Sequence, residues 1–452
     1  MRDTLAGLWH TLTGDTLAPG AAELTGGEDV LPGPFRVEAA AASSIAAATL
    51  SAAEMLRLRG IEPGVVGIDT RHAAAAFQSE RLLRLDGGSP GQFWGPIAGD
   101  YRAADGWVKL HANNRRHESA VCWGLGVPAT REAVAKTVAA KTAYEVESAV
   151  VTAGGAAALL RSHEDWLAHP QGQAVASLPV VDLKPLGEAP PRRLFDSDRP
   201  LGGVRVLELT HVIAGPVAGR VLAAHGANVL HIGAAHLPRI EPLTMDTGMG
   251  KRSAFVALDT EGGRAKLRKL ISRADVVLQS FRPESLARKG FSPEDMAELR
   301  PGLVVADLSA YGWEGPWARR RGFDSLVQMA SGIAHEGAQV AGTDEPRPLP
   351  VQALDHATGW LTAAGIMTAL RRTVTDGGTW HVRLSLAGTG RWLDSLGRKG
   401  STAAEASFDD LLEDVDSDFG RLTRVKMAGV LPGAPPQWTD AAPLPGSGTP
   451  TW

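Results

Sequence analysis

One carboxylate in this chain stands where it could act as a nucleophile. Asp355 ends the segment PLPVQALD and directly precedes a long apolar helix pattern. A carboxylate can attack a thioester and form a mixed anhydride, which divides a difficult acyl transfer into easier steps. Asp is also favoured as a helix N-cap, and the local pattern by itself fits a cap better than a nucleophile.

Basic residues stand beside the ends of two predicted strands. They are Lys251 and Arg252 before the strand expected at 254–258, and Arg282, Arg288 and Lys289 after the strand expected at 275–279. Basic turns are usually solvated, but arginine and lysine also bind phosphates where loops meet at the carboxyl edge of a parallel sheet. We expect these loops to form a crevice for a phosphorylated ligand at that edge.

The run 204–233 reads as strand, tight loop, helix and strand. Gly215-Pro216 opens the helix and Gly226 ends it. An exposed helix N-terminus binds anions, but the GxGxxG signal for dinucleotides is absent from this loop. The pattern argues against NAD and favours another phosphate-bearing ligand. His211 in the loop is either a ligand contact or a packed side chain, and packing is the commoner role.

Several other chemistries find no support. The 13 histidines include no HExxH motif and no tight cluster with carboxylates, so no metal site is expected. No GxSxG motif occurs, and Cys122 is the only cysteine, which rules out an intramolecular disulfide and disfavours Ser or Cys hydrolases. Lys and Arg number 46 against 50 Asp and Glu, which disfavours a nucleic-acid partner.

The N-terminal sequence MRDTLAGLWHTLTG lacks the apolar core of a signal peptide. No apolar stretch looks long enough to span a bilayer. We therefore expect a cytoplasmic protein with no membrane partner.

Composition divides the 452 residues into four parts. They are a helical and strand fragment at 1–95, a small α+β domain at 96–195, a main domain at 196–400 and a tail at 401–452. Short apolar strands alternate with helices in the main domain, which predicts a doubly wound α/β parallel sheet. Its strands are expected at 204–209, 228–232, 254–258, 275–279 and 303–308, and its helices at 217–225, 261–273 and 293–299.

A helix–turn–strand–helix order occurs twice. The first copy has a helix at 38–58, a strand at 65–70 and a helix at 71–85, and the second begins with the helix at 354–372. Aligned without gaps, Asp355 faces Glu38. The order is common in proteins, so a true duplication and a chance match both remain open.

Four motifs, in order, resemble the class III CoA-transferases, the family of formyl-CoA transferase, carnitine CoA-transferase and α-methylacyl-CoA racemase. They are LGGVRVLELTHVIAGPVAGRVLAAHGANVLHI, GKRSAFVALDTEGGRAKLRKLISRADVVLQSFRPESLARKGFS, LRPGLVVADLSAYGWEGPWARRRGFDSLVQMASG and PVQALDHATG. They cover 201–372, and YRAADGWVKLHAN and EDWLAHPQGQA resemble the family's small domain. The resemblance implies a Rossmann-like, CoA-binding sheet with a smaller α+β domain.

The resemblance also implies roles for particular residues. Asp355 matches the family nucleophile, which carries the acyl and CoA intermediates, and Ile213, Arg288 and Arg321 correspond to family CoA contacts. Ile213 stands where formyl-CoA transferase has Gln. The full set expected to bind coenzyme A is His211, Ile213, Ala214, Lys251, Arg252, Ser280, Arg288 and Arg321. Backbone N–H groups near Gly87-Gly88 and Gly91 are candidates for an oxyanion site.

Racemases of the family carry a His in the segment that reads GFDSL here, where this chain has Phe323. One half of the proton-shuttling pair is then missing. The resemblance therefore implies a transferase that moves CoA from an acyl-CoA to a small carboxylic acid through an aspartyl intermediate, with no metal. The alternatives are an acyl-CoA racemase or isomerase on the same fold, and a non-catalytic CoA-binding homologue.

The order of parts departs from the family, in which the nucleotide-binding sheet comes first and the small domain later. Here the small domain comes first, after a fragment that resembles the region following Asp355. Because family members form interlocked dimers, the resemblance implies a homodimer.

Overall fold

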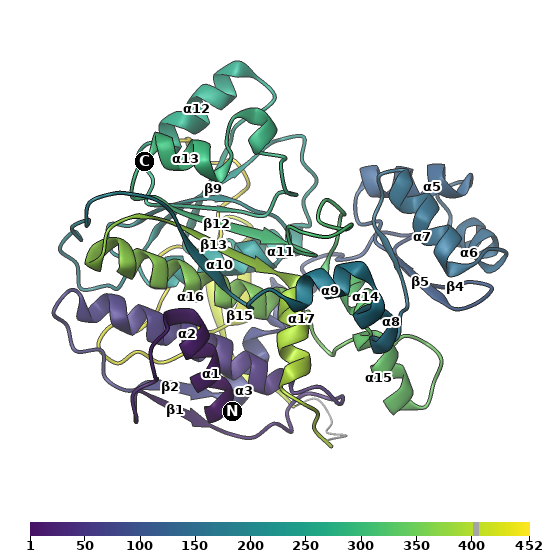
Figure 1. Ribbon diagram of the computed structural model, residues 1–452, viewed down its shortest axis with the longest axis horizontal. Helices are drawn as coiled ribbons and strands as arrows, with labels where there is room; N and C mark the ends of the chain where they lie inside the picture. The colour runs from purple at the N-terminus through teal and green to yellow at the C-terminus, as the bar shows by residue number, and fades with distance from the viewer. Residues whose placement is uncertain (401–405) are drawn as a thin grey trace.

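The computed structural model describes residues 1–400 and 406–452 and has a mixed α/β architecture (Figure 1). Its largest sheet has seven strands in the order β10-β9-β8-β11-β12-β13-β7, all parallel except the antiparallel pair β13–β7. They are β7 (Asp182–Gly187), β8 (Arg205–Leu209), β9 (Asn228–Gly233), β10 (Lys251–Phe255), β11 (Val276–Gln279), β12 (Val304–Ser309) and β13 (Thr379–Ser385). The central strands are runs of buried apolar residues, as expected for parallel strands covered on both faces.

Helices cover both faces of this sheet. Figure 1 shows α12 and α13 on one side and α10 and α16 on the other. The helices of this part are α10 (Ala214–Ala224), α11 (Glu241–Thr247), α12 (Glu261–Ile271), α13 (Pro293–Leu299), α14 (Asp324–Ala330), α15 (Ile333–Ala341), α16 (Ala353–Thr375) and α17 (Leu386–Ser395), with the 3-10 turn η1 (Ala287–Lys289). Along the chain, β8, β9 and β10 lie successively toward one edge of the sheet. The next strands, β11, β12 and β13, lie successively toward the other edge. Parallel sheets form a ligand crevice at such a reversal, outside the carboxyl ends of the strands.

A further helical layer lies against α16. Its central helix is α2 (Val37–Arg57), which packs along α16 (Figure 1). Around it lie α1 (Arg2–Thr13), α3 (Thr70–Ala76), α4 (Ser79–Leu82) and the parallel pair of β1 (Ala22–Thr25) and β2 (Val66–Asp69). By length and composition α2 could cross a membrane, although 94% of its apolar window is buried inside the protein. The prediction that no stretch reaches this length is wrong, because a helix packed on several sides is apolar all round.

The small lobe has its own core. It consists of β4 (Gly99–Arg102), β5 (Trp107–Leu110), β6 (Ala157–Leu159), α5 (Arg115–Leu125), α6 (Arg131–Ala139) and α7 (Ala143–Thr152). Asp105-Gly106 lies between β4 and β5, as predicted. Helices α8 (His163–Ala168) and α9 (Pro170–Ala176) then lead back to the main sheet. The expected domain boundary at 195 is wrong, because β7 pairs with β13 and completes the main sheet's edge.

The C-terminal residues complete the N-terminal part. The strands β14 (Leu412–Ser417) and β15 (Gly420–Val425), preceded by η2 (Asp409–Leu411), form an antiparallel sheet with β3 (Arg84–Leu85). The helix expected at 71–85 is therefore broken, because Leu85 pairs with Leu422. Of the tail expected from residue 401, residues 401–405 lie outside the described part.

The last residues run along the edge strand β10. The N–H of Gly448 donates to the carbonyl of Ser253 (2.8 Å), and the N–H of Gly446 donates to its Oγ (2.9 Å). The tail thus covers polar groups at an edge that would otherwise be open.

Candidate active site

Asp355 lies in the first turn of α16 and is buried, with 6% of its surface exposed. The N-cap of this helix is Gln352, whose backbone has the angles of an inverse γ-turn (φ −75°, ψ 60°). Asp324, at the start of α14, accepts hydrogen bonds from the backbone N–H groups of Leu354 (2.9 Å) and Asp355 (3.0 Å). Because Asp324 satisfies these donors, the cap interpretation of Asp355 is wrong, and its carboxyl group is available for chemistry.

The N-terminus of α10 meets the same carboxyl group. The backbone N–H of Ala214 donates to Asp355. The two helices come this close because Gly359 has no side chain: a Cβ there would lie 2.6 Å from the Ala214 carbonyl oxygen. Val212, two residues earlier, has φ 72°, which strains a β-branched residue. Such strain collects at functional sites, and the helix N-terminus favours negative charge on Asp355.

Burial and neighbouring carboxylates act against that charge. Burial is the largest cause that raises the pKa of Asp355 well above its usual value, and the charges of Asp324 and Glu80 add to it. Burial also raises the pKa of Asp324 to about 6. Carboxyl groups perturbed in this way by burial and by each other are typical of functional sites.

Glu80 reaches the site from the N-terminal part of the chain. Its Oε2 lies 2.9 Å from Nε2 of His356, whose ring stacks on Phe77 with 5.5 Å between ring centres. Burial opposes the charge of Glu80, but attraction to His356 outweighs it and lowers the pKa of Glu80. Sequence reasoning missed Glu80 and Asp324. Asp324 stands in the segment GFDSL, whereas nothing near Glu80 in the sequence indicates the site.

Four of the predicted CoA contacts, His211, Ile213, Ala214 and Ser280, lie beyond the carboxyl ends of β8 and β11. The backbone N–H of His211 donates to Ser280 Oγ (3.2 Å), and Ile213 directly precedes α10. Burial lowers the pKa of His211 to about 4, so its ring is neutral at pH 7. In the part of the chain that the structure describes, His211 Nε2 has no hydrogen-bond partner. An unpaired buried nitrogen of this kind offers a contact to a polar ligand group.

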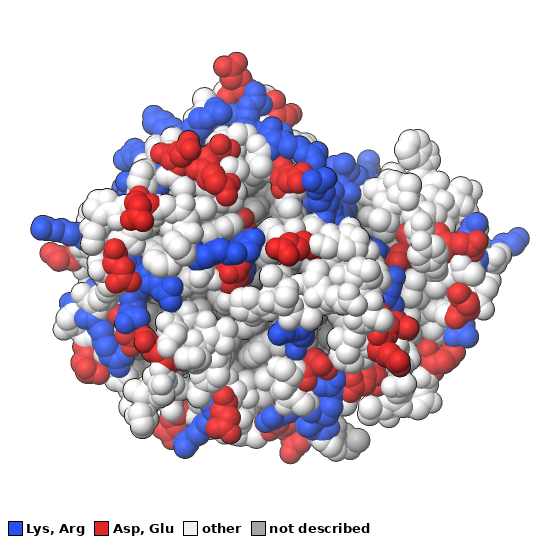
Figure 2. Space-filling model, in the orientation of Figure 1, with Lys and Arg blue, Asp and Glu red and all other residues white. Residues whose placement is uncertain are grey.

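Four arginines gather between the main sheet and the small lobe. Burial, with repulsion from Arg282 and Arg116, lowers the pKa of Arg321 to about 10. Arg288 acts on Arg282 in the same way and itself pairs with Glu284 at 3.2 Å. Among the described residues no ion pair joins Arg116, Arg282 or Arg321 to a carboxylate. Figure 2 shows basic side chains concentrated at the junction of the two lobes on the visible face. Cations left unneutralised attract anionic ligands.

The predicted placement of Lys251 and Arg252 is wrong. Strand β10 begins at Lys251, so both residues lie at its amino end and not in a loop at the carboxyl edge. Lys251 is buried in an ion pair with Glu208 (2.7 Å), and Arg252 donates to the carbonyl of Thr451 in the tail (2.8 Å). The strand begins three residues before its expected start at 254, and the local sequence does not show that Lys251 has a buried carboxylate partner.

Phe323 packs against two imidazoles from the small lobe. Its ring stacks on His111 with 3.6 Å between centres, and the ring of His117 lies 5.7 Å away. Burial is the main cause that lowers the pKa of His111 to about 3 and that of His117 to about 4. Both rings are neutral at pH 7, and they hold the small lobe against the residue that precedes Asp324.

In the glycine-rich loop that was predicted to form the oxyanion site, backbone N–H groups donate to neighbouring residues of the chain. The N–H of Gly88 donates to the carbonyl of Leu85 (2.8 Å), and that of Gly91 donates to Ser89 Oγ (3.3 Å). The backbone donor that meets Asp355 is that of Ala214.

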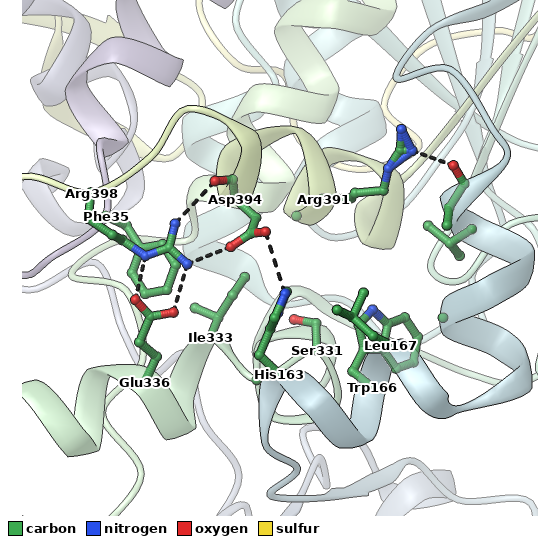
Figure 3. A pocket seen from close by; sticks show the side chains of 15 residues that line it. Phe35, His163, Trp166, Leu167, Ser331, Ile333, Glu336, Arg391, Asp394 and Arg398 are labelled. Carbon is green, nitrogen blue, oxygen red and sulfur yellow. Dashed lines mark hydrogen bonds and ion pairs between the residues drawn. The ribbon is translucent and has the colours of Figure 1, made fainter.

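A surface cavity lies apart from Asp355, between α8, α9, α15 and α17 (Figure 3). Arg398 closes one side of it by pairing with Glu336 and Asp394, and His163 Nε2 lies 3.7 Å from Asp394. None of the carboxylates around Asp355 lines this cavity. It is a separate feature, walled by an ion-pair network.

Comparison with known proteins shows which part of the chain resembles a family. Residues 201–396 match the model of CoA-transferase family III. An acyl-CoA transferase of Gibberella moniliformis is 29% identical over 407 residues, covering 80% of this chain and 71% of that protein. An acetyl-coenzyme A transferase of Hypoxylon pulicicidum is 33% identical over 199 residues, covering 43% of this chain and 34% of that protein. A solved Mycobacterium tuberculosis structure shows a TM-score of 0.39 and 31% identity, over 44% of this chain and 59% of that chain.

The residues that match CoA-transferase family III, 201–396, hold the main sheet from β8 to β13 and Asp355. The Gibberella relative shares sequence well outside that region, since its alignment covers 80% of the chain. The Hypoxylon relative is much longer than the part it shares, because the chain spans about a third of it.

Proposed function

We propose that the protein transfers CoA between an acyl-CoA thioester and a carboxylic acid, with Asp355 as the nucleophile. The observation that carries the proposal is the setting of Asp355: a buried carboxyl group that does not cap its own helix and that meets the N-terminus of α10. The family, and the transferase activity named for relatives, support the same reaction.

The reaction proceeds by exchange at carbonyl carbons. The Asp355 carboxylate attacks the thioester carbonyl, the C–S bond breaks, and a mixed anhydride and CoA thiolate form. The thiolate then attacks the Asp355 carbonyl, which releases the donor acid and leaves CoA as an aspartyl thioester. The acceptor carboxylate attacks this thioester, and the freed thiolate attacks the acceptor carbonyl, which restores Asp355. The N–H of Ala214 stabilises negative charge at the Asp355 carbonyl in these steps.

The CoA moiety has a matching surface. The strand order β10-β9-β8-β11-β12-β13 supports a Rossmann-like sheet, in which the ligand would bind beside β8 and β11. His211 and Ser280 lie at this edge, and Arg282 and Arg321 lie where the small lobe meets it. We assign the phosphates of CoA to the arginines, because their charges have no carboxylate partner among the described residues.

The test is mass spectrometry of the protein after brief incubation with a panel of acyl-CoA thioesters. A covalent adduct on the Asp355 peptide, lost on addition of an acceptor carboxylate as new acyl-CoA appears, supports the transferase. No adduct and no exchange with any donor would contradict it and favour the non-catalytic CoA-binding alternative.

Arg321→Ala is expected to weaken CoA binding by about 1.5–3 kcal/mol, roughly 10- to 150-fold in Kd, the range for a hydrogen bond to a charged group. Its guanidinium is half-buried and repelled by Arg282 and Arg116, so an anion relieves repulsion that solvent does not. Titration calorimetry measures the change. The matched control is Arg57→Ala on α2, an exposed arginine paired with Glu54 and expected to leave the Kd unchanged. Equal Kd values for both variants would remove Arg321 from the site.

The racemase alternative makes a different prediction about the α-hydrogen of the substrate. Proton exchange at that carbon needs an acid and a base on opposite faces, but Phe323 has no proton to give. The neighbouring rings of His111 and His117 stay neutral and are packed around Phe323. In deuterated water a 2-methylacyl-CoA should therefore keep its α-hydrogen while CoA moves to an added acid. Enzyme-dependent deuterium uptake without CoA exchange would favour the racemase.

A further inference from the structure

Two segments far apart in the chain are built alike. Each begins with a Pro-x-Pro sequence, at Pro32 and at Pro348. Each enters a long helix through an inverse γ-turn: φ −82° and ψ 58° at Arg36 before α2, and φ −75° and ψ 60° at Gln352 before α16. The N–H after the turn donates to the carbonyl before it in both, at 2.9 Å and 2.8 Å.

The likeness continues past the helices. A strand follows each long helix, β2 after α2 and β13 after α16. Each strand leads directly into a helix whose N-cap side chain accepts a hydrogen bond. Asp69 accepts from the N–H of His72, and Ser385 accepts from the N–H of Gly388. The same interval separates the two Pro-x-Pro sequences, the two γ-turns and the two caps, so the segments align without a gap.

This alignment corrects the sequence-based one by a single residue. Gln352 corresponds to Arg36, so Asp355 corresponds to Ala39 and not to Glu38. The first segment therefore has a methyl group where the second has its carboxyl group. Glu38 is instead locked in a buried contact with Lys399 (2.6 Å).

The two helices pack so that residues contact positions next to their counterparts. Ser51 Oγ lies 3.5 Å from Thr368 Oγ1, and Ser51 corresponds to the residue just before Thr368. Glu54 Oε2 lies 3.8 Å from Arg371 Nε, again one residue from its counterpart. Contacts this close to the equivalent positions are expected for a pair related by an approximate two-fold axis.

Contacts at the helix starts are exchanged between the segments. Near the end of the first segment, the guanidinium of Arg81 donates to the carbonyl of Pro350 (2.6 Å). At the end of the second, the backbone N–H of Lys399 donates to the carbonyl of Pro34 (2.8 Å), the residue equivalent to Pro350. Each segment thus reaches the helix start of the other, and this exchange is what brings Glu80 to His356.

We infer that residues 32–85 act as a built-in second subunit. They pair with residues 348–399 about an approximate two-fold axis and fill the face of α16 that a second copy of this chain would need. They also supply Glu80 to the surroundings of Asp355. The chain then works as a monomer. Of its two equivalent helix-start turns, only the second is followed by a reactive carboxylate, Asp355. The expected homodimer is unnecessary for a complete site. The pairing itself does not rest on the proposed function, and its test is independent of CoA chemistry.

Disulfide trapping tests the pairing. In a Cys122→Ser background, Ser51→Cys and Thr368→Cys together should form an intrachain disulfide with a mild oxidant, since the two side-chain oxygens lie 3.5 Å apart. The product should migrate as one chain of 47.5 kDa in a non-reducing gel. Thr368→Cys alone should stay unlinked. If α16 instead pairs with α16 of a second copy, Thr368→Cys alone would cross-link two chains. If the two segments are exchanged between two copies, the double variant would cross-link two chains.

A measurement on the unsubstituted protein covers the case in which the variants fail to fold. Light scattering is expected to give the mass of one chain, 47.5 kDa, at all concentrations. A stable dimer would overturn the inference.

Discussion

Asp355→Ala is expected to abolish CoA transfer and the covalent adduct. The loss should reach about three orders of magnitude or more, the scale observed when a catalytic nucleophile is removed. The fold should survive, because Asp324 and not Asp355 accepts the first N–H groups of α16. Turnover with a responsive acyl-CoA donor and intact-protein mass spectrometry provide the measurement. Transfer retained by a folded Asp355→Ala protein would refute the role of this residue.

Asp355→Asn is the control that separates chemistry from stability. Burial raises the pKa of Asp355 in the folded protein above its value in the unfolded chain. The folded state therefore loses stability as pH rises through that raised pKa, and an uncharged Asn avoids the loss. Asp355→Asn should be inactive but more stable than the unsubstituted protein by about 1 kcal/mol or more at about pH 8, with the difference fading toward about pH 4. Thermal unfolding at both values of pH checks the sign.

Lys251→Met is expected to destabilise the fold by about 3–5 kcal/mol, because it leaves the buried carboxylate of Glu208 without its cation. Lys251 Nζ lies 2.7 Å from Glu208 Oε2 and donates to the carbonyl of Pro216 (2.7 Å). Burial by itself would raise the pKa of Glu208, but Lys251 and His231 outweigh it and hold that pKa at about 2. Denaturant unfolding measures the loss.

The matched control is the double variant Lys251→Met with Glu208→Gln, which removes both charges and should recover much of the lost stability. The fit is tight, because a Cβ on Gly219 would lie 1.9 Å from Glu208 Oε2. CoA affinity of the folded double variant should be unchanged. A large loss of affinity with little loss of stability would restore Lys251 as a phosphate ligand.

The sequence by itself determined the elements and one residue of the site. Alternating apolar runs predicted the strands of the main sheet within a few residues, because hydrophobic periodicity and Gly or Pro stops are local properties. The turn before α16 and the family motifs singled out Asp355, and chain order placed His211 and Ser280 at one edge, since both directly follow parallel strands.

Only the tertiary structure decided the partners. The local sequence made Lys251 look like a surface cation, but in the fold Glu208 and Pro216 surround it. The local sequence also made Asp355 look like a helix cap, but Asp324 accepts the first backbone N–H groups of α16. Glu80 lies 275 positions before Asp355 in the chain, and its approach depends on how α2 packs along α16. Burial and charge pairing are set by contacts between distant segments, and no local pattern encodes which of many buried faces a helix will meet.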